Sequence, residues 1–397
     1  MQLEGGIAAT RLSVLGGGSW GTALAMVLAP RFGRVSLWTY EADLAAEMAA
    51  ERENKVFLPG FRLPPNIDVT SSLAEGLRDS SIVLGVMPST VLRQVYIDAK
   101  SFIPPHVPIV SATKGIERGT QKRMSEIIAE VTGHTRIAVL SGPSFAREVA
   151  RGEPTFVVVA GAETALCEEV QRAFTGPTFR IYTSTDPIGA EVGAALKNVI
   201  AIAAGICHGL GLGSNAMAAL ITRGLAEITR LAVSMGARPA TLAGLAGLGD
   251  LILTCTGELS RNRRVGVELS KGKSLEEITG SMRMVAEGIE NTYSAVELAR
   301  RQGVSMPIAE TLYSIFTDGK SPHDALRELM AQAARADRLR LGQVPARIRA
   351  AHRCGAKTRG GAAECDGARR VDQPAEADVE RAVAYASDVG GRSNRPR

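Results

Sequence analysis

The sequence has few aromatic residues and few cysteines. Phe, Trp and Tyr make up 4% of the 397 residues, so we expect a core built mainly from Ala, Val, Leu and Ile. Scattered, odd-numbered cysteines without a CxxC pair argue against a disulfide framework and a zinc site. We therefore expect no bound metal and free thiols in a reducing, cytoplasmic compartment. The five cysteines are Cys167, Cys207, Cys255, Cys354 and Cys365.

The sequence also lacks a targeting signal and an uninterrupted hydrophobic run. Residues 1–10 contain no basic segment followed by an apolar one, which argues against a signal peptide. The most apolar stretch, Ile188–Leu212, contains Glu191, Lys197, Asn198 and His208. A central charge costs about 2.5–3.5 kcal/mol in a membrane span. This stretch is therefore predicted to be a buried helix of a globular protein, not a membrane span.

The net charge of +5 does not indicate nucleic-acid binding, because the excess lies at the C-terminal end. Residues 331–397 carry 14 Lys and Arg against 8 Asp and Glu, whereas the first 330 residues carry 32 against 33. The body is thus nearly neutral, and no nucleic-acid partner is expected. The end of the chain has few large apolar residues with which to offset its chain entropy. We expect residues 333–397 to form a disordered basic tail.

Short apolar runs alternate with helical stretches in the first half of the chain. This alternation is typical of a parallel sheet covered by helices on both faces. Helices are expected at 19–29 and 44–50, and a proline-rich loop at 58–65. Strands are expected at 11–15, 34–38, 81–86, 107–112, 137–140 and 156–160, with a short last one at 180–182.

Strand signals end near Asp186-Pro187, and long Ala/Leu/Ile-rich stretches follow. This change predicts an α/β domain over residues 1–187 and an all-α domain over residues 188–332. Helices are expected at Ile188–Gly209, Asn215–Met235, Leu275–Ala299 and Ile308–Phe316.

A GxGxxG motif formed by Gly16, Gly18 and Gly21 follows the first strand and opens the first helix. In this context Gly16 permits a tight turn, Gly18 lets the backbone approach a pyrophosphate, and Gly21 allows close packing of helix on strand. The free N–H groups at the helix start then face the phosphates. The motif predicts a Rossmann-type, doubly wound domain that binds a dinucleotide.

The end of the second strand leaves the choice between NAD and NADP open. An acidic residue at this tip binds the adenine ribose and favours NAD. Here the tip is Trp38-Thr39-Tyr40, with Glu41 just after it, and no basic residue follows closely. Arg31 and Arg34 lie before the tip and could reach a phosphate. Arginines in such positions are more commonly exposed to solvent.

Two polar loops follow neighbouring predicted strands at the edge where α/β sheets bind ligands. Ser111–Gly115 contains Lys114, and Ser141–Ala146 contains a Gly-Pro turn with hydroxyls. Either loop alone is equally consistent with a plain surface turn. Their position at one edge favours a binding function for both.

The helical half contains three further candidate groups. Lys197 lies on a helix that is apolar nearly all round, which favours a buried lysine with a lowered pKa, suited to proton transfer, over one that extends to solvent. Asp250, in a glycine-rich turn, either orients such a lysine or caps a helix. Ser260, Arg261 and Asn262 at a helix start fit a phosphate clamp better than a solvated basic turn.

Seven segments together resemble the bacterial NAD(P)-dependent glycerol-3-phosphate dehydrogenases. The resemblance covers about residues 10–332, and residues beyond about 330 depart from the family pattern. It implies a Rossmann domain followed by an all-α domain, NAD or NADP as cofactor, a small phosphorylated substrate, a homodimer, and a supply of glycerol 3-phosphate for phospholipid synthesis. The segments, in order, are GGGSWGTALA, SATKG, SGPSFA, ALKNVIAIAAG, GLGDLILTCT, SRNRR and VAEG.

The resemblance also implies roles for individual residues. Lys197 matches the proton-transferring lysine of the family, with Lys114 and Asp250 as its catalytic partners, and Lys114 touches both cofactor and substrate. The implied substrate contacts are Lys114, Gly142, Ser144, Lys197, Asp250, Ser260, Arg261 and Asn262. The implied cofactor contacts are Gly16, Gly18, Ser19, Trp20, Gly21, Tyr40, Lys114, Ala146, Arg261, Val285 and Glu287.

Two other functions are consistent with parts of this pattern. A Rossmann-plus-helical dehydrogenase of a 2- or 3-hydroxy acid, or a ketopantoate reductase, shares the glycine turn and the helical lysine but has less need of the Ser-Arg-Asn clamp. A non-enzymatic sensor of the nicotinamide redox state needs only Gly16–Gly21. The presence of Lys197 and Asp250 disfavours the sensor.

Overall fold

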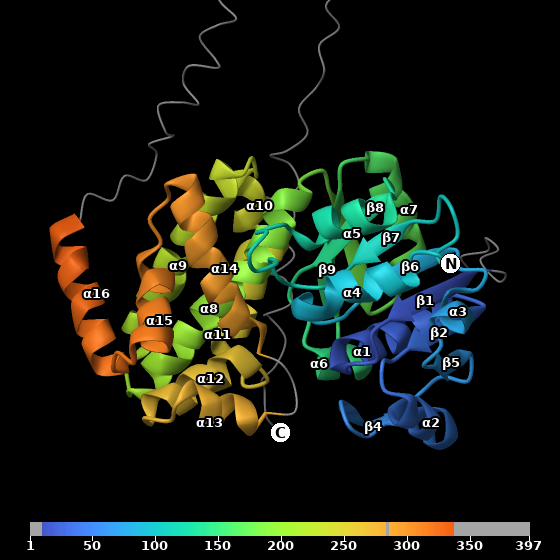
Figure 1. Ribbon diagram of the computed structural model, residues 1–397, viewed down its shortest axis with the longest axis horizontal. Helices are drawn as coiled ribbons and strands as arrows, with labels where there is room; N and C mark the ends of the chain where they lie inside the picture. Colours follow the sequence, from blue (N-terminus) through green and yellow to red (C-terminus); the bar gives the residue numbers. More distant parts are fainter. Residues whose placement is uncertain (1–9, 283–285, 337–397) are drawn as a thin grey trace, which may run out of the picture. The chain divides into compact units, whose positions relative to one another are not determined.

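The N-terminal strands assemble into one eight-stranded sheet with the order β10-β9-β8-β7-β6-β1-β2-β5 (Figure 1). The computed structural model describes residues 10–282 and 286–336, so Val285 and residues 337–397 lie outside the described residues. The strands of this sheet are β1 (Arg11–Leu15), β2 (Arg34–Trp38), β5 (Ile67–Thr70), β6 (Ile82–Gly85), β7 (Ile109–Ser111), β8 (Ile137–Ser141), β9 (Thr155–Gly161) and β10 (Phe179–Ser184).

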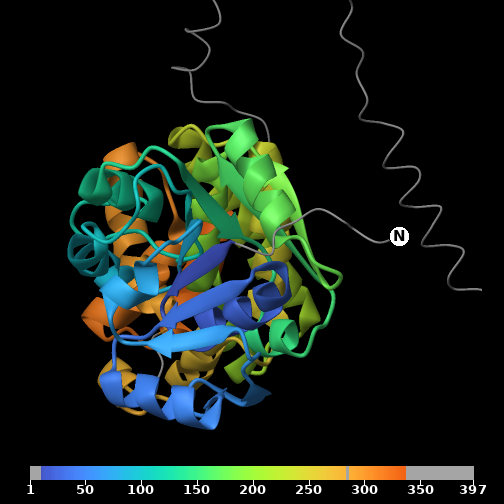
Figure 2. The same cartoon turned by 90° about the vertical axis from the view of Figure 1, so that its right-hand side faces the viewer.

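Helices cover both faces of this sheet, as predicted (Figure 2). Leu12 and Val14 of β1 pack in one apolar cluster with Leu24 of α1, whereas Leu15 packs in another with Tyr96 of α4 and Ile127 of α5. Side chains of a strand alternate between faces, so an apolar run such as β1 suits a sheet buried on both sides. The helices are α1 (Ser19–Leu28), a 3₁₀ turn (Ala29–Arg31), α2 (Ala42–Glu51), α3 (Leu73–Leu77), α4 (Ser89–Ala99), α5 (Met124–Thr132), α6 (Ala146–Ala150) and α7 (Thr164–Phe174).

The sheet differs from the predicted all-parallel arrangement at one strand pair. β9 runs antiparallel to β8, and β10 then pairs with β9 in parallel. Only the five-residue helix α6 lies between β8 and β9. A helix rises less than half as far per residue as a strand, so α6 is too short to return the chain along the sheet for a parallel crossover.

The proline-rich loop predicted at 58–65 instead contains a strand of a small hairpin. β3 (Glu53–Asn54) pairs antiparallel with β4 (Leu58–Arg62), which includes Pro59. Proline is tolerated here because both strands of a two-stranded ribbon are edges. The chain then enters β5, a short edge strand in which Ile67 is the one fully buried residue and which the apolar pattern therefore does not reveal.

The chain after β10 is helical, as predicted, and is organised around α8 (Pro187–Gly209). Residues 189–207 of α8 are all buried, and although α8 is long and apolar enough to cross a membrane, it is a core helix. Around it lie α9 (Ser214–Ser234), α10 (Pro239–Ala243), a π-helical turn (Leu245–Gly249), α11 (Asp250–Thr256), α12 (Arg261–Ser270), α13 (Leu275–Gly280), α14 (Glu287–Gln302), α15 (Pro307–Asp318) and α16 (Pro322–Ala336).

Two predictions in this half need correction. The single helix expected at Leu275–Ala299 is two helices, because α13 ends at Gly280 and α14 begins at Glu287. Glycine is a poor residue for a helix interior. Residues 333–336, which the sequence assigned to the tail, lie in α16.

Helices α8 and α12 pack with their backbones in contact. A Cβ atom on Gly205 would lie 1.9 Å from Arg263 O, and one on Gly266 would lie 2.0 Å from Ile202 O. Only glycine permits this approach, since real Cβ atoms keep well beyond such distances. The start of α12 is therefore held directly against the helix that carries Lys197.

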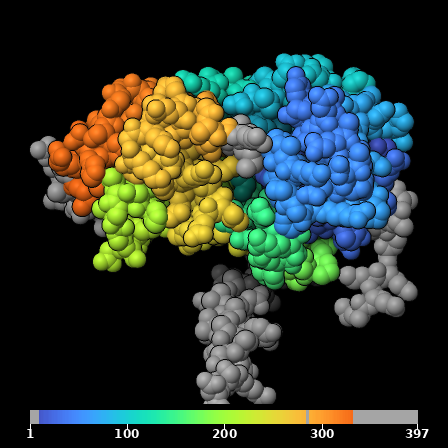
Figure 3. Space-filling model, turned by 90° about the horizontal axis from the view of Figure 1, so that it is seen from below, coloured from blue at the N-terminus to red at the C-terminus, as the bar shows by residue number. Residues whose placement is uncertain are grey.

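A small apolar cluster joins the sheet to the helical half. Val139, Val158 and Ala160 of β8 and β9 pack against Ala190 of α8 and Ala246 of the π-helical turn. In the surface view, the blue-to-green N-terminal residues and the yellow-to-orange C-terminal residues occupy opposite sides (Figure 3).

Candidate active site

The structure brings Lys114, Lys197 and Asp250 together from three separate segments. Lys197 Nζ donates to Asp250 Oδ1, and Lys114 Nζ donates to Asp250 Oδ2 at 2.8 Å. The exposed fractions of these side chains are 7% for Lys197, 1% for Asp250 and 17% for Lys114. Asp250 is the first residue of α11 and binds both lysines, which is the arrangement that its predicted orienting role requires. The predicted capping role is wrong, because Gly249 occupies the N-cap position and the helix start has no side-chain cap.

Burial lowers the pKa of Lys197 to about 7. The Asp250 carboxylate acts in the opposite direction, and the Lys114 ammonium lowers the pKa further. Removing an ammonium group from water disfavours its charged form, and the single carboxylate is shared by two cations. Lys197 can therefore give up or accept a proton near neutral pH.

Thr254 is a partner of Lys197 that the sequence analysis did not assign. Its hydroxyl accepts from Lys197 Nζ at 2.9 Å and donates to Asp250 O at 2.6 Å. Thr254 lies four residues after Asp250 on the same helix, so both face the same side. This spacing within GLGDLILTCT is the signal that could have revealed it.

The two predicted ligand-binding loops lie side by side. Lys114 Nζ donates to Gly142 O at 3.3 Å, and Ser144 Oγ donates to the same oxygen at 3.0 Å. Gly142 has φ 136, a conformation that favours glycine. A Cβ on Gly257 would lie 2.5 Å from the Phe145 ring, so the segment leading into α12 packs on this loop.

The start of α12 presents the predicted phosphate-binding residues. Ser260 Oγ caps the helix by accepting from Arg263 N at 3.3 Å, and Arg261 follows as an exposed first residue. Asn262 is buried, and its Oδ1 accepts from Gly288 N at 2.9 Å. Burial lowers the pKa of the Arg261 guanidinium, while the charge of Glu287 acts in the opposite direction. A helix start with such a guanidinium can bind a phosphate through both its N–H groups and its charge.

Glu287 connects this region to the sheet. Its carboxylate accepts from Ser89 N at 3.1 Å and from Ser89 Oγ at 2.5 Å. Burial raises the pKa of Glu287, while the hydrogen bonds from Ser89 and the charge of Arg261 lower it. Ser89, the first residue of α4, is a second contact that the sequence analysis did not assign, and its one local signal is the hydroxyl after Pro88.

The glycine turn has the shape that a dinucleotide requires. A Cβ on Gly16, which has φ 125, would lie 2.3 Å from Val86 O, and one on Gly21 would lie 1.8 Å from Gly16 O. A Cβ on Gly18, the N-cap of α1, would meet nothing within 4 Å. The first and third glycines are thus required by the protein's own packing, and Gly18 leaves open space at the helix start for a pyrophosphate.

The remaining predicted cofactor contacts surround this turn or lie at the end of β2. Ser19 and Trp20 open α1, and Trp20 Nε1 is buried without a hydrogen-bond partner among the described residues. Ala146 opens α6, which packs on α1. Tyr40 is 80% exposed and stands edge-on to Trp38, with ring centroids 6.4 Å apart.

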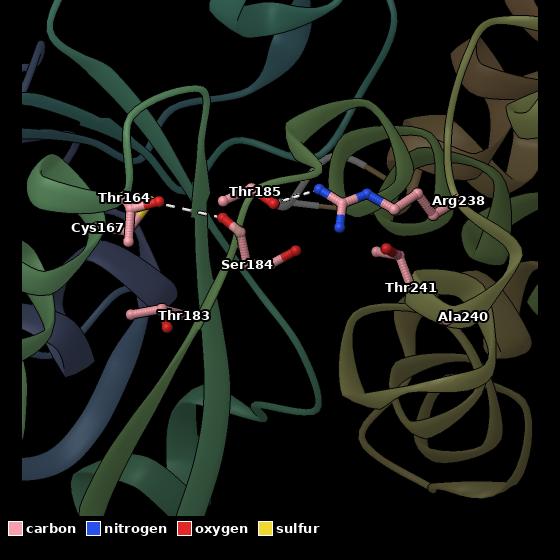
Figure 4. Close-up of a pocket in the computed structure, with 8 residues that line it drawn as sticks. All are labelled: Thr164, Cys167, Thr183, Ser184, Thr185, Arg238, Ala240 and Thr241. Carbon is pink, nitrogen blue, oxygen red and sulfur yellow. Dashed lines mark hydrogen bonds between the residues drawn. The ribbon is translucent and has the colours of Figure 1, made fainter. Parts of the chain in front are cut away.

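A cavity of about 400 Å³ lies elsewhere, where β10 and α7 meet the segment around α10 (Figure 4). Its lining includes several hydroxyls and Arg238, which donates to Thr185 Oγ1. None of the predicted site residues lines it. The lining residues labelled in Figure 4 hold no group suited to proton transfer near neutral pH, so the lysine pair is the better candidate for the active site.

Comparison with known proteins decides the family. The sequence profile of the NAD-dependent glycerol-3-phosphate dehydrogenase N-terminus matches residues 11–167, and that of the C-terminus matches residues 186–327. The chain belongs to this family. A glycerol-3-phosphate dehydrogenase [NAD(P)+] from Citrifermentans bemidjiense is 52% identical over 332 residues, which cover 83% of this chain and 99% of the relative. The chain is an oxidoreductase that uses NAD or NADP.

Solved structures agree with this assignment. The glycerol-3-phosphate dehydrogenase from Coxiella burnetii is 40% identical, has a TM-score of 0.79, and matches over 81% of this chain and 99% of its own. A ketopantoate reductase from Ralstonia eutropha is similar in fold alone, with 14% identity and a TM-score of 0.54. The rival hydroxy-acid and ketopantoate functions are therefore not favoured.

Proposed function

We propose that this chain reduces dihydroxyacetone phosphate at C2 to sn-glycerol 3-phosphate, catalyses the reverse reaction, and uses Lys197 for the proton transfer. The observation that carries the proposal is the buried pair of lysines on one carboxylate. A carbonyl reduction needs a proton donor and a positive charge at the developing alkoxide, and the two ammonium groups supply both.

Lys197 donates its proton to the C2 oxygen while hydride is added to C2. Lys114 stabilises the negative charge on that oxygen, and Asp250 keeps both ammonium groups aimed at one point. A reduced nicotinamide dinucleotide supplies the hydride when it is bound. In the oxidation, neutral Lys197 takes the proton from the C2 hydroxyl.

Ser260, Arg261 and Asn262 hold the substrate phosphate, and Gly142 and Ser144 contact the rest of the substrate. Support comes from the position of Arg261 at the N-terminus of α12 and from the packing of Gly257 on Phe145. Fixing the phosphate places C2 in reach of the lysines.

The glycine turn binds the cofactor pyrophosphate, with Ser19 and Trp20 beside it and Tyr40 near the adenosine. Ala146, Lys114, Arg261 and Glu287 complete the cofactor contacts, together with Val285, which lies outside the described residues. The open space at Gly18 supports this arrangement.

We also propose a division of work between two domains, with residues 1–187 binding the cofactor and residues 188–332 carrying Lys197, Asp250 and the phosphate clamp. The finer setting is a cytoplasmic homodimer that supplies glycerol 3-phosphate for phospholipid synthesis. Support for the compartment is that Cys167, Cys207 and Cys255 are free thiols. Light scattering after gel filtration tests the dimer, and cell fractionation tests the location.

The test of the reaction follows nicotinamide absorbance with purified protein, using NADH and NADPH in parallel. Dihydroxyacetone phosphate is compared with unphosphorylated dihydroxyacetone and with ketopantoate. Rapid oxidation with the phosphorylated substrate alone supports the proposal. Oxidation with ketopantoate but not with dihydroxyacetone phosphate, in protein that binds NADH, overturns it.

A further inference from the structure

Asn291 is a buried amide that links two separate segments of the active site. It lies in α14 and is 1% exposed. Its Oδ1 accepts from Ile116 N at 3.4 Å, and its Nδ2 donates to Ala195 O at 3.1 Å. One side chain thus bonds to a loop of the sheet domain and to the central helix of the other domain.

The two bonded residues stand next to the two lysines. Ile116 follows Lys114 by two residues, and Ala195 precedes Lys197 by two residues on α8. Asp250 joins the two ammonium groups at their tips, whereas Asn291 joins the backbones that carry them. A displacement of either backbone would change the separation of the ammonium groups.

The Lys114 loop is packed closely against α14 at this point. A Cβ on Gly115 would lie 2.4 Å from Ser89 Cβ and 3.4 Å from Asn291 Oδ1. Three residues along the helix from Asn291, Ser294 Oγ donates to Ile116 O at 3.0 Å. The N–H and the C=O of Ile116 are therefore both bonded to α14.

The amide group suits this double contact for a simple chemical reason. It offers an acceptor and donors at one side-chain end, whereas a carboxylate only accepts and leucine does neither. Without the amide, the buried N–H of Ile116 and the carbonyl of Ala195 each lose a hydrogen-bond partner. This loss favours movement of the Lys114 loop away from α8.

We propose that Asn291 is a positioning residue for the reaction, holding the Lys114 loop at a fixed separation from the helix that carries Lys197. This inference rests on the roles assigned to the two lysines under the proposed function. Asn291 touches neither substrate nor cofactor and acts through the lysines. A misplacement of about 1 Å can cost about 100-fold in rate.

The first test compares Asn291→Leu with Thr292→Val. Thr292 is the next residue on α14, is equally buried, and donates to Gly288 O within its own helix, so Thr292→Val is a matched control. We expect kcat of Asn291→Leu to fall about 10–100-fold, with KM for dihydroxyacetone phosphate and the dissociation constant of NADH changed less than about threefold. Thr292→Val should keep kcat within about threefold of the wild type. An unchanged kcat in folded Asn291→Leu overturns the proposal.

The second test is a double-mutant cycle with Lys114→Ala. If Asn291 acts through Lys114, Asn291→Leu should lower kcat much less in the Lys114→Ala background than in the wild type. A residue that only stabilises the fold lowers kcat by the same factor in both, and that result overturns the proposal. Should Asn291→Leu not fold, Asn291→Asp, which keeps the size and the acceptor, takes its place in both tests.

Failure of the proposed function is distinguishable from failure of this inference. A wild-type chain that binds NADH but does not oxidise it with dihydroxyacetone phosphate refutes the function. If the wild type turns over normally but the effects of Asn291→Leu and Lys114→Ala on kcat are additive, only the role of Asn291 is refuted.

Discussion

The Lys197 ammonium group and the Asp250 carboxylate form a buried ion pair between residues 53 positions apart in the chain. The same carboxylate also binds Lys114, so it cannot fully offset the burial of Lys197. The outcome is that the pKa of Lys197 is lowered to about 7. The first two predictions concern this residue.

The two directions of the reaction should respond oppositely to pH. Reduction needs protonated Lys197, so kcat should fall as pH rises through about 7, whereas oxidation needs neutral Lys197, so kcat should rise through the same interval. The measurement is kcat against pH in each direction with saturating substrates. Lys197→Arg, which cannot lose its proton near neutral pH, should lose most of the activity. In this variant kcat should neither fall with pH in the reduction nor rise with pH in the oxidation. Profiles that move in the same direction would contradict the role of Lys197.

Thr254→Val should reduce kcat about three- to tenfold and move the pH profile to lower pH. The variant removes an acceptor that stabilises charged Lys197, and so lowers its pKa further. Thr256→Val is the matched control, because Thr256 is on the same helix but is exposed and donates to Ile252 O. Thr254→Ser keeps the hydroxyl and should restore most of the rate. If kcat depends on pH in the same way in Thr254→Val, Thr254→Ser and Thr256→Val, the hydrogen bond from Lys197 to Thr254 does not affect the reaction.

Two glycines of the nucleotide turn should fail in different ways when changed to alanine. Gly18→Ala should leave the melting temperature unchanged but weaken NADH binding about tenfold or more, because its Cβ meets no protein atom and fills the space needed by the pyrophosphate. Gly21→Ala should lower the melting temperature, because its Cβ would overlap Gly16 O. Calorimetry and fluorescence titration of NADH check both. Normal NADH binding by Gly18→Ala would refute the placement of the cofactor.

Glu227 should make the stability of the helical half depend on pH. Its buried carboxylate accepts from Ile308 N at 3.0 and 3.1 Å, and burial raises its pKa to about 7. An unfolded glutamate has a pKa of about 4.3, so between about pH 4.3 and 7 the folded state binds a proton that the unfolded state does not. Stability is therefore lost as pH rises through this interval.

The variant Glu227→Gln should lose less stability than the wild type between pH 5 and 8. For each protein, denaturant titration gives the loss of unfolding free energy between pH 5 and pH 8. We expect this loss to be about 1–3 kcal/mol smaller in Glu227→Gln than in the wild type. Glu258→Gln, which changes an exposed carboxylate between α11 and α12, is the control and should match the wild type. Parallel pH profiles for Glu227→Gln and the wild type would disprove the effect.

Local patterns were sufficient to predict the strands that carry the site. β1 and β2 begin and end where predicted, because each is an apolar run bounded by glycine or polar residues, and both ligand loops follow buried strands. The edge strand β5 and the hairpin of β3 and β4 escaped prediction. They bury little apolar surface, and their pairing depends on neighbours rather than on their own sequence.

The partners within the site could not be derived from spacing. Lys114 and Asp250 are 136 residues apart, and Asn291 and Ala195 are 96 apart, so only tertiary packing brings the members of each pair together. The two roles of Asp250 were equally consistent with a glycine-rich turn followed by a helix. The choice depends on two lysines that local sequence does not place.

The contact between Gly205 and Gly266 limits how α8 and α12 can move relative to each other. With no side chains between them, α8 and α12 cannot slide or separate without breaking close backbone packing. The proposed proton donor and the proposed phosphate clamp are therefore held in one rigid unit. The separation of Lys197 from the start of α12 is thus set by contact between two backbones, so it does not depend on the rotamer of any side chain between them.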